Sequence, residues 1–285
     1  MEPDRQELED KRRELGETEE PVEDELAEAF RSTLTEGAER LSRTWRALLI
    51  TGLFGGIDVG LGIMAMLAVK EATGSDLLAG MAFGIGLFAL RLAHSELFTE
   101  DFLVPIQAVV AKHGTWMQLG RLWSATLVTN LAGGWLFTWL IAVSFPDLGS
   151  TLLETAQGYL EGGLSLETAG LALLAGSTIT LTTRMAQGTQ NDVVTGFISL
   201  ISGFLVVGTG MLHGALNSIV LFAAMHMDAP ISYGEWAVWA LWVIPLNMVG
   251  GLVIITVPRL FRTLELIQEE RAKQGRKQAE EHRAI

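Results

Sequence analysis

The chain has 285 residues, of which 20 are basic and 33 acidic, and it contains no cysteine. Residues 1–46 carry 23 of these charges and residues 259–285 carry 12, so only 18 remain for the 212 residues between them. A soluble domain has about 25% charged residues, and the middle region is therefore too apolar to be a soluble enzyme core. The net charge of −13 argues against nucleic acid as a partner, because phosphate backbones are bound by clustered Lys and Arg. Without cysteine, disulfides and iron–sulfur clusters are excluded.

Residues 1–46 form a charged segment that we expect in the cytoplasm, with no cleavable signal peptide. The part up to about residue 20 is rich in charge and poor in apolar residues, which is typical of disorder. From about Val22 an apolar residue recurs every four positions, through Leu26, Phe30 and Leu34, which predicts an amphipathic helix. This helix either packs on a neighbouring element or lies along the membrane surface.

Residues 47–258 contain apolar runs of about 18 residues or more, the signal of transmembrane helices. The predicted fold is an all-α polytopic membrane protein whose six spans cover residues 47–69, 77–111, 122–143, 166–185, 193–225 and 236–257. Lys and Arg gather in the loops that would share one side, which places both termini in the cytoplasm of a plasma (inner) membrane protein. Residues 259–285 then form a charged cytoplasmic tail.

Six spans divide into three plus three, and halves with an odd number of spans insert with opposite orientations. Any internal repeat is therefore inverted, and spans two and five occupy matching positions. Both are interrupted: span two around residues 91–101, and span five around Gly203 and again at residues 208–210. Paired interruptions of this kind point to a substrate path, because non-helical backbone at membrane depth is tolerated only inside protein or beside a cavity. Alternatively, the glycines are helix-packing contacts.

Two motifs in the interrupted spans resemble a known family. The stretch from Glu96 to Thr99, followed by an apolar run that ends at residues 111–114, resembles the second-helix break of the formate/nitrite transporter family. The stretch from Gly210 to Asn217, with a His followed four residues later by an Asn, is similar to that family's fifth-helix motif. The resemblance covers about residues 40–262.

The resemblance implies a homopentamer of aquaporin-like protomers in the lipid bilayer, each with its own path for small monovalent weak-acid anions, with or without linked protons. Two apolar constrictions would flank a central His on broken helix five. Carried over position by position, the substrate path would include His213, its partner Asn217, the loop residue Thr99, Leu97 and Phe98 in the cytoplasmic constriction, and Val206 in the periplasmic one.

The chain also departs from the family pattern. Leu212 stands where many members have a Glu, and Gly176 stands where the better-known formate channels have an Asn. At the outer end of span four, where those channels have a Lys, this chain has Glu161 and no basic residue. An acidic vestibule repels anions, so the resemblance is greatest to the poorly characterised YfdC-like branch, and the transported anion stays open.

Three polar residues of the breaks have competing interpretations. His213 lies near the middle of span five, where ionisable residues are functional by default, and an unperturbed His exchanges protons near neutral pH. The alternative is a His that is hydrogen-bonded within the helix bundle. Thr99 either donates to an anion or caps the helix that restarts after the break. Glu96 is expected to be structural, with its carboxylate accepting hydrogen bonds from loop N–H groups.

Asp58 and Arg91 would each be costly at membrane depth without a partner, and we expect them to form a structural pair. The alternative is that Arg91 lines the path and attracts the anion. The only other basic residues between 47 and 258 are Lys70, Lys112, Arg121 and Arg184, and all four lie at span ends.

No catalytic, cofactor or metal motif emerges, and we predict that the protein is not an enzyme. The leading hypothesis is a channel or proton-linked transporter for small weak-acid anions. A membrane-embedded sensor or scaffold with a regulatory cytoplasmic head is an alternative of another class. A neutral small-solute pore is a third, disfavoured because neither half has an Asn-Pro-Ala box.

Overall fold

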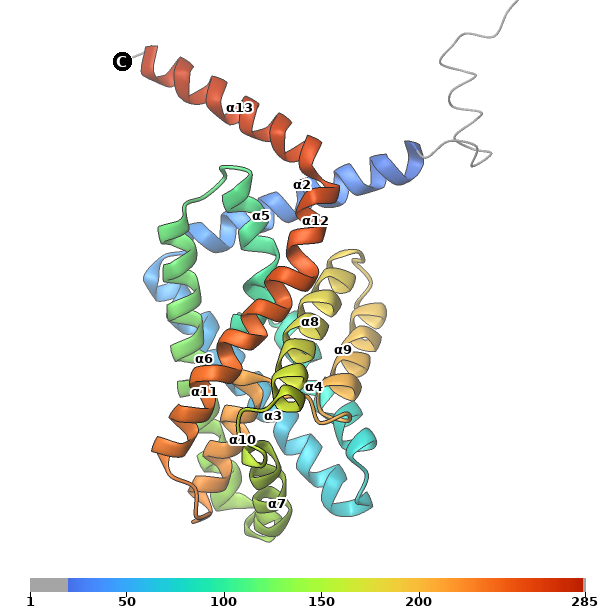
Figure 1. The fold of residues 1–285 in the computed structure, drawn as a ribbon, viewed down its shortest axis with the longest axis vertical. Helices are drawn as coiled ribbons and strands as arrows, with labels where there is room; N and C mark the ends of the chain where they lie inside the picture. Colours follow the sequence, from blue (N-terminus) through green and yellow to red (C-terminus); the bar gives the residue numbers. More distant parts are fainter. Residues whose placement is uncertain (1–19, 284–285) are drawn as a thin grey trace, which may run out of the picture.

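The structure is a computed structural model that describes the backbone of residues 20–283 and the side chains of residues 26–276. All regular elements in this described part are helical. They form an elongated bundle with α2 crossing one end and α7 at the other (Figure 1). The predicted disorder of the first residues falls on 1–19, outside the described residues.

Three helical segments are long and apolar enough to cross a membrane: α3 (Trp45–Thr73), α6 (Trp116–Ser144) and the run Tyr233–Arg262. This last run consists of α11 (Tyr233–Val249), the π-helical η3 (Gly250–Thr256) and α12 (Val257–Arg262). Each segment has 29 or 30 residues, and at 1.5 Å per residue such a length reaches about 43–45 Å. These lengths match a bilayer with its headgroup layers.

The two predicted interruptions are present as breaks between shorter helices. The first separates α4 (Asp76–Leu92) from α5 (Val104–Val110) and contains the 3₁₀ helix η1 (Phe98–Phe102). The second separates α9 (Asp192–Val206) from α10 (Gly214–His226). The further break expected at Gly203 is wrong, because this residue lies within α9. A Cβ there would collide with the backbone of α4, so the glycine serves helix packing.

The remaining helices connect and cover the two ends. Helix α8 (Leu166–Gln187) covers the predicted fourth span, residues 166–185. The sequence did not predict α7 (Gly149–Leu160), which follows the short η2 (Pro146–Leu148). Helix α2 (Glu20–Ser42) packs on α5 and α6, burying Phe30, Leu34 and Leu41. Helix α13 (Leu264–Arg283) starts beside α2, where Ile267 joins Phe30 and Leu34, and then extends away from the bundle (Figure 1).

Candidate functional site

The first break is held by a buried asparagine of α6. The Asn130 side chain donates hydrogen bonds to the carbonyls of Gly52 (2.7 Å) and Glu96 (2.8 Å), and accepts one from the N–H of Phe98 (2.9 Å). Because Glu96 and Phe98 flank Leu97, the three bonds fix the backbone on both sides of that residue. They also join the break to α3, so its position is set by tertiary contacts.

The second break is held in the same way by Asn247 of α11. Its side chain donates to the carbonyls of Ala172 (2.7 Å) and Leu212 (2.8 Å), and accepts from the N–H of Gly214 (2.7 Å). These bonds fix the backbone on both sides of His213. We call Asn130 and Asn247 the break asparagines.

Sequence reasoning missed the break asparagines, although the chain contains a signal for them. Each is a fully buried amide in an apolar helix, and each is followed three residues later by a glycine, Gly133 or Gly250. A Cβ at Gly133 or Gly250 would collide with a carbonyl of α3 or α8, respectively. The same Asn-x-x-Gly spacing in both halves therefore combines a close helix approach with an amide that reaches the break.

His213 and Thr99 meet where the two breaks come together. The Nδ1 atom of His213 accepts a hydrogen bond from the Leu216 N–H (3.1 Å) at the start of α10. The neutral ring consequently carries its hydrogen on Nε2, which lies 2.9 Å from the Thr99 hydroxyl oxygen. Thr99 lies inside η1 and caps no helix, and its own hydroxyl hydrogen has no acceptor among the described residues.

A narrow cavity of about 10 Å³, which we call the central cavity, lies against His213. Its lining is otherwise apolar and consists of Val59, Phe83, Leu87, Leu97, Ile179, Val206 and Leu216. A space of this size holds about one water molecule. The structure thus brings Leu97, Val206 and His213 together. Phe98 does not line the cavity and instead packs edge-on against Phe102, with ring centroids 5.1 Å apart.

Two wide cavities flank the central one. The α7-side cavity, about 560 Å³, is lined by α7 and by residues 207–210 of the second break. The α2-side cavity, about 660 Å³, is lined by α2, the end of α4 and the end of α8. Along α4, Ala79 lines the first, Phe83 and Leu87 line the central cavity, and Leu90 lines the second. Because these positions are about one helical turn apart, the three cavities follow one another along α4.

The α7-side cavity is acidic, as the sequence suggested. Its one basic lining residue is Lys70, which pairs with Asp76 (3.1 Å) and lies 4.0 Å from Glu154. Glu161 adds a further carboxylate to the lining. No basic side chain of the described lining is left unpaired to attract an anion.

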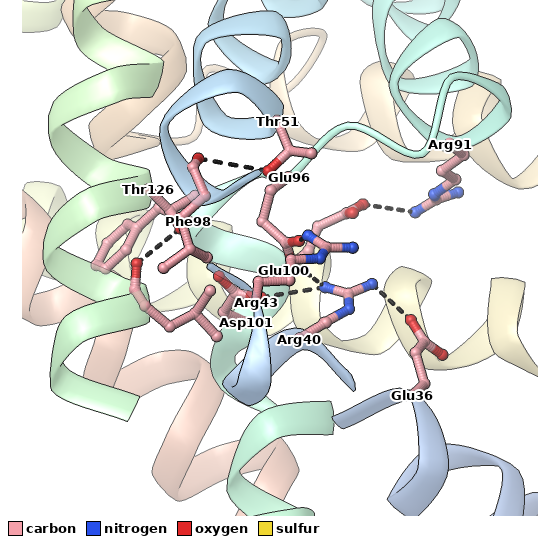
Figure 2. A network of polar contacts seen from close by, with 12 residues as sticks. Glu36, Arg40, Arg43, Thr51, Arg91, Glu96, Phe98, Glu100, Asp101 and Thr126 are labelled. Atoms are coloured by element: carbon pink, nitrogen blue, oxygen red, sulfur yellow. Dashed lines mark hydrogen bonds and ion pairs between the residues drawn. The ribbon is translucent and has the colours of Figure 1, made fainter. Parts of the chain in front are cut away.

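At the α2-side cavity, Arg40 of α2 joins three acidic residues (Figure 2). Its guanidinium lies 2.6 Å from Glu36, 2.6 Å from Glu96 and 3.1 Å from Asp101. Burial alone would lower the pKa of Arg40, but the surrounding carboxylates outweigh this effect and raise it, so the group stays charged. Arg43 also pairs with Glu96. The Glu96 carboxylate therefore binds arginines, and the expectation that it accepts loop N–H groups is wrong.

The expected pair of Asp58 and Arg91 is also wrong. Arg91 pairs with Glu100 at 3.3 Å and donates to the Ser199 hydroxyl at 3.1 Å, and it lines the α2-side cavity. Asp58 is half-buried, and one of its carboxylate oxygens has no hydrogen-bond partner among the described residues. Arg91 lies in the last turn of α4. Its partner Glu100 belongs to η1, the 3₁₀ helix within the first break.

Two residues singled out by the family resemblance have unexpected surroundings. Asn217 is fully buried, and neither polar atom of its amide has a partner among the described residues. Gly176 lies directly against the backbone of Asn247. A side chain at position 176 would push α8 and α11 apart, which explains why this chain cannot carry an Asn there.

Comparisons with known proteins agree with this arrangement. The family description "Formate/nitrite transporter" matches residues 27–261. The formate channel BtFdhC of Bacillus thuringiensis is 28% identical over 184 residues, 60% of this chain and 71% of that protein. The inner membrane protein YfdC of Escherichia coli (strain K12) is 25% identical over 138 residues, which cover 46% of this chain and 43% of that protein.

The fold also matches solved structures. A structure titled "FNT family ion channel" superposes with a TM-score of 0.75 at 18% identity, covering 83% of this chain and 99% of the other. One titled "Pentameric formate channel with formate bound" gives 0.64 at 20% identity, covering 77% and 98%. The chain therefore belongs to the formate/nitrite transporter family.

Proposed function

We propose that the protein is a homopentameric membrane channel or proton-linked transporter for small monovalent weak-acid anions of the formate and nitrite kind. The observation that carries the proposal is the contact of His213 with Thr99 beside a narrow apolar cavity between two wide ones. Formate channels among the relatives support the substrate class, and the pentameric title of a solved neighbour supports the assembly.

In this proposal the three cavities form the path of each protomer, with Leu97 and Val206 as the walls of its narrowest part. An unpaired charge is costly in an apolar constriction, whereas the protonated acid crosses far more readily. The Thr99 hydroxyl accepts the Nε2–H of His213, and its own hydrogen is left to donate where the anion would lose its water. Asn217 follows one turn later on α10, and its unpartnered amide supports a polar role there.

We further infer six spans in an inverted three-plus-three repeat, with both termini in the cytoplasm of the inner membrane. The matching bonds of the two break asparagines support the repeat. Helices α2 and α13 lie at the same end (Figure 1), together with Arg40, Arg43 and Arg184, whereas Lys70 lies at the other end. Residues 47–258 would then be the transport unit, with cytoplasmic segments 1–46 and 259–285.

Flux into liposomes tests the proposal. Purified protein should pass formate and nitrite, with and without a pH gradient, and its particles should show five-fold symmetry. Particles of another symmetry would contradict the proposed assembly. A folded protein that passes no weak-acid anion would favour the sensor or scaffold hypothesis. Passage of neutral solutes alone would favour the small-solute pore.

Replacing His213 by Asn should change the pH profile of flux while the protein still assembles. Asn can accept the bond from the Leu216 N–H through its amide oxygen, but it cannot exchange a proton. Flux should be measured across a wide pH range, because the imidazole can exchange a proton and the amide cannot. His226, at the end of α10 and outside the three cavities, provides the matched control as His226→Asn. An unchanged profile in folded His213→Asn protein would leave His213 a structural role alone.

The role of Arg91 can be tested with variants of Arg91 and of its partner Glu100. Arg91→Gln leaves the buried Glu100 carboxylate without its cation, which costs roughly 3–5 kcal/mol, so assembly should fall. Adding Glu100→Gln should restore assembly, because the stranded charge is removed. We expect flux of the double variant to stay several-fold below wild type, since Arg91 lines the α2-side cavity. Full recovery of flux would show that the pair is only structural.

A further inference from the structure

A second arginine cluster lies beside the α2-side cavity, where α8 and α12 end. Arg184 is in the last turn of α8, and Arg259 and Arg262 are in the last turn of α12. All three line one small cavity of about 50 Å³, whose other lining residues are Leu26, Phe30, Thr33, Gln107 and Thr263. Arg184 and Arg259 are half-buried, and Arg262 is exposed.

This cluster lacks the acidic partners that Arg40 and Arg91 have. Among the described residues, none of the three forms an ion pair, whereas Arg40 and Arg91 each pair with a carboxylate. The nearby Glu36 is already bonded to Arg40 at 2.6 Å and to Gln187 at 3.4 Å. Guanidinium groups held close together in a medium less polar than water repel one another. The cluster therefore favours an anion from outside the described part of the chain.

Exposed apolar side chains lie within one turn of the cluster on both helices. Leu181 and Met185 flank Arg184, and Val257 and Phe261 flank Arg259. Helix α8 packs against η3, the segment that leads into α12, so these side chains belong to neighbouring helices. A ligand at the cluster would thus meet cationic groups at its head and an apolar surface beside it.

We propose that Arg184, Arg259 and Arg262 bind the phosphate of an anionic phospholipid, with its acyl chains along the exposed apolar residues of α8 and α12. Guanidinium groups bind phosphate through paired hydrogen bonds, and basic pockets between transmembrane helices hold anionic headgroups. The helix C-termini also favour cations at this position. Free phosphate would use the arginines but not the apolar surface, so the lipid fits both features.

The full-length protein can test this in nanodiscs of phosphatidylglycerol or phosphatidylcholine. We compare wild type, the triple variant Arg184→Gln/Arg259→Gln/Arg262→Gln, and the control Arg46→Gln. Arg46 is an exposed arginine at the start of α3 that lines none of the cavities described above. Native mass spectrometry should show phosphatidylglycerol retained by wild type and by the control, with at least about tenfold less on the triple variant. Phosphatidylglycerol should also raise the Tm of wild type and control, and not that of the triple variant.

Three results would overturn the proposal: equal retention of phosphatidylglycerol by the triple variant, equal stabilisation by phosphatidylcholine, or equal stabilisation of detergent-solubilised wild type by inorganic phosphate alone. The first would also be expected if acidic residues of the N-terminal segment or of another protomer occupy the cluster. If the triple variant fails to fold, Arg262→Gln replaces it, because Arg262 is the exposed member. This variant should lose at least about threefold of the retained lipid, and unchanged retention would count against the site.

Discussion

Replacing Arg40 by methionine should prevent stable assembly, the largest loss of stability expected from a single side chain of the α2-side network. Arg40 joins Glu36, Glu96 and Asp101, and the last two are almost completely buried. Methionine preserves the apolar stem but leaves the buried Asp101 without its cation and Glu96 with Arg43 alone. Removing one partner of a buried ion pair costs roughly 3–5 kcal/mol. Thermal unfolding and the pentamer fraction in detergent would measure the effect.

Three further variants make the Arg40 result specific. Arg46→Met, at an exposed arginine, should change the free energy of unfolding by less than about 0.5 kcal/mol. Glu96→Gln/Asp101→Asn should restore much of the stability of Arg40→Met, because neutral amides no longer need the cation. Arg40→Lys should keep only part of the wild-type stability, since one ammonium cannot reach partners on several sides as a guanidinium does. Wild-type stability of Arg40→Met would mean that water, or the remaining Arg43, solvates these carboxylates.

The sequence was sufficient to predict the features that depend on local pattern. The apolar runs, the two breaks and the residues His213, Leu97 and Val206 all follow from spacing or from the family motifs, and the structure brings these three residues to one cavity. The α7 helix was missed because it is short and lies between two spans, where the sequence suggested only a loop.

The choice of partners could not be predicted, because it depends on where the breaks turn in space. The sequence places both Arg91 and Asp58 within apolar spans, which suggested that they pair with each other. In the structure, η1 brings Glu100 to Arg91, and Asp58 is not its partner. Arg40 of α2, and Arg43 just after it, reach Glu96 because α2 crosses this end of the bundle, a tertiary contact without a local signal. Asn130 resembles any polar residue of a transmembrane helix until its partners on α3 and in the break are known.

The two break asparagines should have different functional effects even though their bonds are alike. Asn130→Ala and Asn247→Ala each leave a buried N–H and two buried carbonyls with fewer partners, and each unsatisfied group costs about 1–3 kcal/mol. Both variants should therefore lower Tm. Beyond this common loss, Asn130 fixes the backbone around Leu97, and Asn247 fixes the backbone around His213.

Flux measurements should separate the two effects. Asn130→Ala should loosen the apolar wall and raise lactate flux relative to formate several-fold, with an unchanged pH profile. Asn247→Ala should displace the His213 ring and change the pH profile. Asn191→Ala is the matched control, because this exposed asparagine only caps α9 through the N–H groups of Val193 and Val194. If folded Asn130→Ala and Asn247→Ala reduced all fluxes equally and kept the wild-type pH profile, the break asparagines would stabilise the bundle without positioning Leu97 or His213.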